Sequence, residues 1–184
     1  MSEPIGERHD RTVRLQTAQG SIVGRLLVSP RLRTLDDLNV VAKSFVTLHA
    51  PRLSGMDWPF DGRPLAVNKD FILFVAEVTP MPPRPGSPFG SGFTRGTLRV
   101  RVGEFDVRGS VHLPRGGASL ARLSHDTHPF VAMTSASVTG PDLQLTAPFL
   151  AVSRRQILAA QEIRDDASEL VGVTDEARGE PVEE

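Results

Sequence analysis

The chain has 184 residues, a formal net charge of −1 at pH 7 and no cysteine. The lack of cysteine excludes disulfides, thiolate zinc sites, iron–sulfur clusters and a cysteine nucleophile. A hydrophobic content of 39% is typical of a globular protein with one sizeable core or two small ones.

The start MSEPIGERHD has neither the apolar segment nor the cleavage site of a secretory signal. No apolar run reaches the roughly 18 residues that a membrane-spanning helix needs, so we expect a cytoplasmic protein without membrane insertion. Lysine occurs only at Lys43 and Lys69, a preference for arginine typical of GC-rich bacterial coding. Residues 164–184 hold eight acidic and two basic residues, whereas residues 12–163 hold 17 basic and 11 acidic residues. A mildly basic body therefore carries an acidic tail.

The sequence contains an internal repeat. Residues 13–78 aligned without a gap on residues 98–163, at a constant offset of 85, give 14 identities in 66 positions, where chance gives about four. The run LAV with the following Ile-Leu recurs, as do glycines and apolar residues elsewhere. These are the positions that a shared backbone constrains, so we interpret the chain as a duplication.

In chain order, each copy predicts strand, strand, short helix, strand, strand, strand. Alternation of apolar and polar residues predicts strands, and Gly103 with Glu104 suits a type II′ hairpin turn. We expect the equivalent turn of the first copy at Gln19 and Gly20. Thr34 and Ser119 begin the helical segments and are expected to cap them. The expected strands cover residues 13–17, 21–28, 45–50 and the bent segment 66–72, then 98–102, 105–113, 130–135 and the bent segment 151–157.

The predicted fold is mainly β. Five short strands with one short helix per copy favour two tandem homologous small barrels of the SH3-like or Sm-like kind, and two bent five-stranded sheets are the alternative. We expect a pseudo-two-fold relation between the copies. The predicted organisation is a disordered N-terminus at 1–11, β-repeats at 12–78 and 97–163, a Pro/Gly-rich linker at 79–96, and a disordered acidic tail at 164–184.

The last strand of the first copy is bulkier than that of the second. Phe71, Phe74 and Val75 stand where the second copy has a glutamine and two alanines. Each buried phenylalanine stabilises a fold by roughly 1.5–3 kcal/mol, so we expect this surface to be covered. The cover is a larger core of the first copy, the second copy, or an external partner.

Two further groups of residues are candidates for binding. Trp58 and Phe60 lie in the loop before this strand and form either a partner-binding tip or a cap on the barrel end. On the second hairpin, the predicted turn places Arg99 opposite Arg108 and Arg101 opposite Asp106. Facing arginines indicate an anion-binding surface, unless they simply extend into water.

Catalytic and metal chemistry have little support in the sequence. The segment H-D-T-H at 125–128 has the spacing of metal ligands on a helix, but a loop before Pro129 explains it equally well. GSPFGSGFTRG matches no phosphate-binding spacing, and no G-x-S-x-G elbow supports a serine nucleophile. We therefore expect no enzyme, no metal site and no cofactor.

The order of motifs in each copy resembles that of small bacterial domains of unknown function. These motifs are a hairpin strand with a central glycine (IVGRLLV, VRGSVHL), a Leu-x-x-Leu helix, FVTL or FVAM, and in the first copy LAVNKDFI. The resemblance covers both copies, about 130 residues. It implies a small β-domain used as an assembly or interaction module, and it transfers no active-site residue. VNKDFI is also similar to the tight turn before the last strand of SH3-like barrels, at the level of fold only.

Three functions follow as hypotheses. The first is a non-enzymatic adaptor or scaffold that binds a protein partner through the β-repeats, and unpaired strand edges also favour self-association. The second is an Sm-like nucleic-acid binder that uses the three arginines and is inhibited by the acidic tail, although the chain lacks the tyrosines that often serve as stacking platforms. The third is a small-ligand sensor with a pocket between the repeats.

Overall fold

The computed structural model describes residues 9–29, 32–78, 93–114, 117–125 and 127–163. We call residues 9–78 the first half and residues 93–163 the second half. The first half contains β1 (His9–Thr17), β2 (Gly20–Val28), α1 (Thr34–Leu38), β3 (Phe45–Ser54), β4 (Leu65–Asn68), the 3-10 helix η1 (Lys69–Phe71) and β5 (Ile72–Glu77). The second half contains β6 (Phe93–Val102), β7 (Phe105–Pro114), α2 (Ser119–His125), β8 (Phe130–Thr139), β9 (Gln144–Ser153), η2 (Arg154–Gln156) and β10 (Ile157–Ile163).

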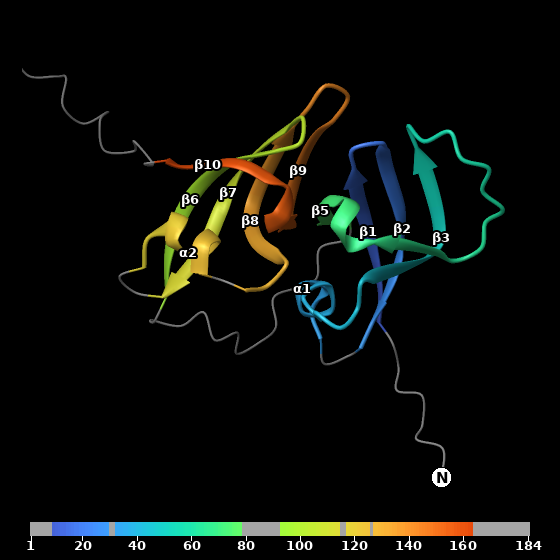
Figure 1. Ribbon diagram of the computed structural model, residues 1–184, viewed down its shortest axis with the longest axis horizontal. Helices are drawn as coiled ribbons and strands as arrows, with labels where there is room; N and C mark the ends of the chain where they lie inside the picture. The colour runs from blue at the N-terminus through green and yellow to red at the C-terminus, as the bar shows by residue number, and fades with distance from the viewer. Residues whose placement is uncertain (1–8, 30–31, 79–92, 115–116, 126, 164–184) are drawn as a thin grey trace, which may run out of the picture.

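All ten strands belong to one antiparallel sheet. Their order is β10-β6-β7-β8-β9-β5-β1-β2-β3-β4, so each half contributes five adjacent strands. In Figure 1 the second half lies on the left and the first half on the right, and β9 and β5 meet between them. The sheet is open, because β10 and β4 lie at its opposite ends. No helix in the described ranges is long and apolar enough to cross a membrane.

The two halves have the same strand pairing at the offset of 85 residues. Val13 pairs with Gly24 in the first half, and Leu98 pairs with Gly109 in the second. Both halves carry a bulge in the last strand and another between the second and third strands. Among the described non-glycine residues, positive φ occurs only at Ala50 (45°) and Ser135 (49°), again 85 positions apart. The repeated sequence thus specifies a repeated backbone.

Several sequence-based expectations need correction. The halves join through one open sheet to which each contributes five adjacent strands, in place of two tandem small barrels or two independent five-stranded sheets. The predicted pseudo-two-fold relation is also wrong, because a two-fold axis pairs equivalent edges, whereas β5 is joined to β9. The first hairpin turn lies at Ala18 and Gln19, one residue earlier than predicted. By contrast, Gly103 has a φ of 54°, which suits the first position of the predicted type II′ turn.

The domain limits also shift by a few residues. β1 begins at His9, inside the N-terminal segment predicted to be disordered, and β6 begins at Phe93, inside the predicted linker. Both extensions lengthen hairpins whose partner strands continue to Val28 and Pro114. Residues 1–8, most of the linker and the acidic tail lie outside the described residues.

A glutamate at the end of the last strand holds the start of the short helix in each half. In the second half, Glu162 Oε1 accepts the backbone N–H of Ser119 at 2.6 Å and that of Leu120 at 3.2 Å. In the first half, the equivalent Glu77 accepts a hydrogen bond from the Thr34 hydroxyl. Thr34 is therefore the first helical residue and not the predicted cap, and its hydroxyl fastens the helix to β5.

A basic residue at the start of the 3-10 helix holds the other end of the short helix. Lys69 Nζ donates to the carbonyl of Val40 at 3.0 Å, and Arg154 Nε donates to the carbonyl of Leu123 at 3.1 Å. Leu123 lies in the last turn of α2, where a cation can satisfy a carbonyl that has no partner within the helix, whereas Val40 lies two residues beyond the end of α1. The β4–β5 or β9–β10 segment of each half thus holds the short helix at its start and the chain at or just after its end.

The glutamate contact predicts a pH dependence of stability. Hydrogen bonds from Ser119 and the Leu120 backbone hold the pKa of Glu162 below its unfolded value of 4.5. Its stabilising contribution is therefore present above pH 4.5 and is lost as pH falls through the folded pKa. Urea unfolding at a series of pH values should show that Glu162→Gln lowers the free energy of unfolding at neutral pH. The same variant should reduce the loss of stability between neutral and acidic pH. Glu104→Gln, in the exposed β6–β7 turn, is the control. If Glu162→Gln leaves the loss of stability at acidic pH unchanged, the result would contradict this contact.

Candidate functional site

The junction between the halves is made by backbone pairing of β5 with β9. Phe74 pairs with Val152, Val75 with Ala151, and Ala76 with Leu150. The last strand of the first half therefore lies between β1 of its own half and β9 of the second half. This position requires apolar side chains on both of its faces, which explains why five of the six residues of β5 are buried.

The two halves exchange core residues across this junction. Leu73, Phe74 and Ala76 of β5 belong to a hydrophobic cluster whose other members all come from the second half. In return, Phe130 and Ala151 belong to the cluster that is otherwise built from the first half. Neither half encloses its own core completely. Separating the halves would expose apolar surface in both, so the junction is an integral part of the fold.

An aromatic pair anchors this exchange. Phe74 is fully buried, and its ring meets the ring of Phe105 edge to face, with centroids 5.3 Å apart and planes at 86°. Such a pair adds about 0.5–1.5 kcal/mol to the burial of the two rings. The Phe105 ring also lies directly against Gly140, so closely that a Cβ atom at position 140 would overlap it.

Polar contacts fix the end of the junction near the 3-10 helices. The side chain of Asn39 accepts the backbone N–H of Phe130 at 2.9 Å and donates to the carbonyl of the same residue at 3.1 Å. Arg155 of η2 forms an ion pair with Asp70 of η1 at 2.8 Å, and Gln156 donates to the Asp70 carbonyl at 2.7 Å. These bonds run between halves and set the register of the first half on the second.

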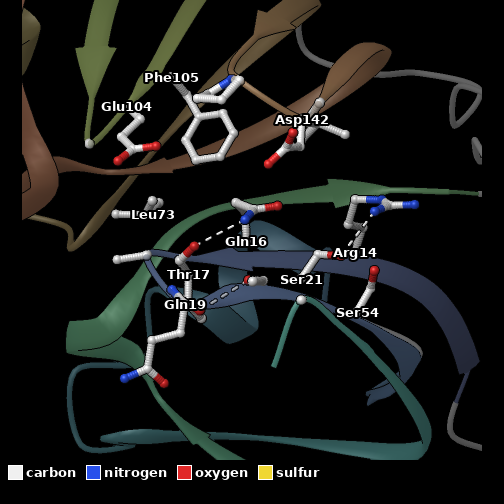
Figure 2. Close-up of a pocket in the computed structure, with 16 residues that line it drawn as sticks. Arg14, Gln16, Thr17, Gln19, Ser21, Ser54, Leu73, Glu104, Phe105 and Asp142 are labelled. Carbon is white, nitrogen blue, oxygen red and sulfur yellow. Dashed lines mark hydrogen bonds between the residues drawn. The ribbon is translucent and has the colours of Figure 1, made fainter. Parts of the chain in front are cut away.

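A hollow of about 320 Å³ lies at the other end of the junction. Figure 2 shows Gln16 and Arg14 of the first half facing Glu104, Phe105 and Asp142 of the second half across it. The Arg14 guanidinium donates to Ser21 at 3.1 Å and Gln16 donates to the Thr17 carbonyl at 3.0 Å. Side chains from both halves line this hollow, so it corresponds in position to the predicted pocket between the repeats.

A second hollow, of about 470 Å³, lies beside the 3-10 helices and is lined by four cations. Each of them already has a partner. Lys43 pairs with Asp37 at 2.7 Å and Arg155 with Asp70. Lys69 donates to the carbonyl of Val40, just after α1, and Arg154 donates to the carbonyl of Leu123 in α2. Burial lowers the pKa of Lys69, opposed by the nearby Asp37 carboxylate. These cations therefore serve the fold and the junction and do not form a free anion-binding cluster.

The two ends of the sheet are open and carry exposed apolar side chains. At one end, β10 pairs only with β6, and Leu158 is 80% exposed. At the other end, β4 pairs only with β3, and the adjacent Phe45 is 54% exposed. Unpaired strand edges bind other strands readily. Each end of the sheet thus combines an unpaired strand edge with an exposed large apolar side chain.

The predicted partner-binding residues divide into two groups. Phe74 and Val75 are completely buried, so they do not form a free surface. The second-half core covers Phe74, whereas Val75 belongs to the first-half core. Phe60 packs partly against the first-half core. Phe71 (69% exposed) and Trp58 remain on the surface.

The predicted anion-binding residues have the expected register but a different pairing. Arg99 is opposite Arg108 and Arg101 opposite Asp106, as predicted. However, the Asp106 carboxylate binds the Arg99 guanidinium diagonally through two nitrogens. This contact lowers the pKa of Asp106 and raises that of Arg99. Asp106 therefore neutralises one of the facing arginines, which reduces the positive charge available to an anion.

Metal binding and the comparisons add no further site. Within the described ranges, no three histidine, aspartate or glutamate side chains gather as metal ligands. Asp126 of the H-D-T-H segment lies outside those ranges. Protein-family models, curated proteins and solved structures give no match to this chain.

Sequence reasoning missed Asn39, Asp70 and Arg155, which join the halves, and Phe45 and Leu158, which lie at the open edges. The aligned positions 70 and 155 carry opposite charges, so the repeat contained a signal that these residues could form an ion pair between the halves. The aligned leucines 73 and 158 are identical, yet one is buried and the other is exposed. Only the order of strands reveals that difference.

The junction predicts a large effect of a single truncation. Phe74→Ala removes a fully buried ring and its aromatic partner contact, so the free energy of unfolding should fall by about 3–5 kcal/mol in a denaturant titration. Phe71→Ala is the matched control and should change it by less than about 0.5 kcal/mol, because Phe71 is exposed. Similar losses in both variants would contradict the junction.

Proposed function

We propose that the protein is a non-enzymatic scaffold that binds protein partners through the two open edges of its ten-stranded sheet. The observation that carries the proposal is the combination of an unpaired strand with an exposed large apolar side chain at each end, Leu158 beside β6 and Phe45 beside β4. An edge strand offers a row of backbone donors and acceptors to an incoming strand, and adjacent apolar groups add affinity. Two edges on one chain allow it to link two partners.

The construction of the sheet supports this proposal. The central strands are fixed by the exchange of core residues between halves, so the two edges are held in a constant relation to each other. A scaffold needs this rigidity, because partners bound at the two ends are then placed in a defined geometry. The small helices, fastened by Glu77 and Glu162, further stiffen each half.

Two other functions remain predictions. Nucleic-acid binding through Arg99, Arg101 and Arg108 is less favoured, because Asp106 neutralises Arg99. Binding of a small ligand is supported only by the position of the hollow of about 320 Å³ between the halves. Neither explains the exposed apolar side chains at the sheet ends.

Site-specific photo-crosslinking tests the scaffold proposal in the cells that produce the protein. A photoreactive amino acid replaces Leu158 on the open β10 edge, and a second variant carries it at Glu104 in the exposed β6–β7 turn. We expect irradiation to join the protein to a polypeptide from position 158 but not from position 104. Position 158 yielding no more polypeptide adduct than position 104 would contradict the proposal.

A further inference from the structure

We propose that copies of this chain associate head to tail, with β10 of one copy pairing with β4 of the next. This inference rests on the proposed use of the sheet edges and names their occupant, a second copy. The internal junction supplies the template, because it already joins the last strand of one half to the fourth strand of the other. The unpaired strands at the ends are the last strand of the second half and the fourth strand of the first.

The open edges match the internal junction at its three paired positions, although β4 has four residues and its counterpart β9 has ten. The internal pairs are Phe74 with Val152, Val75 with Ala151, and Ala76 with Leu150. Moving each residue by the offset of 85 gives Ala159 with Val67, Ala160 with Ala66, and Gln161 with Leu65. All six residues lie in β10 and β4. The equal registers within the halves make these positions structurally equivalent.

The exposed apolar side chains match residues that are buried at the internal junction. Phe45 is equivalent to Phe130, which is 1% exposed and inserts into the core of the other half. Leu158 is equivalent to Leu73, which is 4% exposed and inserts in the opposite direction. Head-to-tail association would bury both exposed residues in the manner of their buried counterparts.

Additional exposed apolar groups lie at equivalent positions. Leu120 of α2 is exposed, whereas its counterpart Leu35 packs partly against the first-half core and lines a hollow beside Phe130. Trp58 is exposed, whereas its counterpart Leu143 packs against the second-half core. Phe45 and Leu158 thus occupy positions that the internal junction buries, and Leu120 and Trp58 occupy positions whose counterparts line hollows between the halves.

Charge complementarity is retained when the roles of the two halves are exchanged. At the internal junction, Asp70 lies on the β5 side and Arg155 on the β9 side. At a junction between copies, Arg155 lies on the β10 side and Asp70 on the β4 side. The two residues are about two-thirds exposed in the single chain, which leaves room for a second partner. A series of copies would therefore alternate aspartate and arginine along the line of junctions.

The junction between copies should be weaker than the internal one. Ala159 and Gly20 replace the aromatic pair of Phe74 and Phe105 at the aligned positions. Ser124 replaces Asn39, whose side chain makes two bonds to the backbone across the internal junction. The association is accordingly reversible, whereas the internal junction is permanent. Because the contact is heterologous, successive copies close into a ring or extend as a filament.

Complementation of two edge variants tests the proposal. Phe45→Arg blocks the β4 edge and leaves β10 intact, and Leu158→Arg blocks the β10 edge and leaves β4 intact. Val78→Arg places the same charge on an exposed apolar residue directly after β5, away from both open edges. Light scattering coupled to size exclusion measures the masses of the full-length proteins.

We expect the wild-type chain and Val78→Arg to have masses that are multiples of 20.0 kDa and greater than one chain. Each edge variant alone should be a monomer. Their equimolar mixture should form a dimer of twice 20.0 kDa, since one intact β10 edge meets one intact β4 edge. The dimer also shows that both variants are folded.

Other results would overturn the proposal. A monomeric wild-type chain would contradict head-to-tail association. If the wild-type chain is monomeric and associates only after deletion of residues 164–184, the β10 edge would be assigned to the chain's own tail, which also rejects the proposal. An edge variant that dimerises alone would indicate pairing of like edges. Photo-crosslinking from position 158 to a different protein, together with a monomeric purified chain, would retain the scaffold function and reject self-association.

Discussion

The pairing of β5 with β9 is the interaction on which the rest of this structure depends. Three residue pairs join the strands, and each half places side chains in the core of the other. The two halves consequently form one sheet with two open ends. The position of every exposed edge, and of every apolar residue beside it, is a consequence of which strands this junction uses.

The junction also accounts for the divergence of the two copies. β5 is covered on both sides by other strands, and it retains Phe74 and Val75 as buried residues. β10 has the same sequence ancestry in our interpretation, but it lies at the end of the sheet and carries alanines at the aligned positions. An edge strand with two exposed bulky side chains would be strongly adhesive. The loss of bulk in β10 is therefore consistent with a contact that must open as well as close.

Much of the local structure could be predicted from the sequence, because alternation, turn glycines and the repeat act over short distances. The type II′ position of Gly103 and the opposition of Arg99 and Arg108 are examples. The arrangement of the halves could not be predicted, since periodicity does not reveal which edge a strand presents to another unit. The surplus apolar character around Phe74 indicated a covered surface but not its cover. The exposed Phe45 is identical in type to the buried Phe130, so composition alone could not separate them.

Amide hydrogen exchange of β5, β9 and β10 tests the central claim most directly. Backbone groups of β5 and β9 have strand neighbours on both sides, whereas β10 has one neighbour within the chain. With the association of copies prevented by Leu158→Arg, the amides of Val75 and Ala151 should be as protected as those at the centre of β1. Exchange of these amides as fast as that of β10 would show that the halves separate, and it would contradict a single ten-stranded sheet.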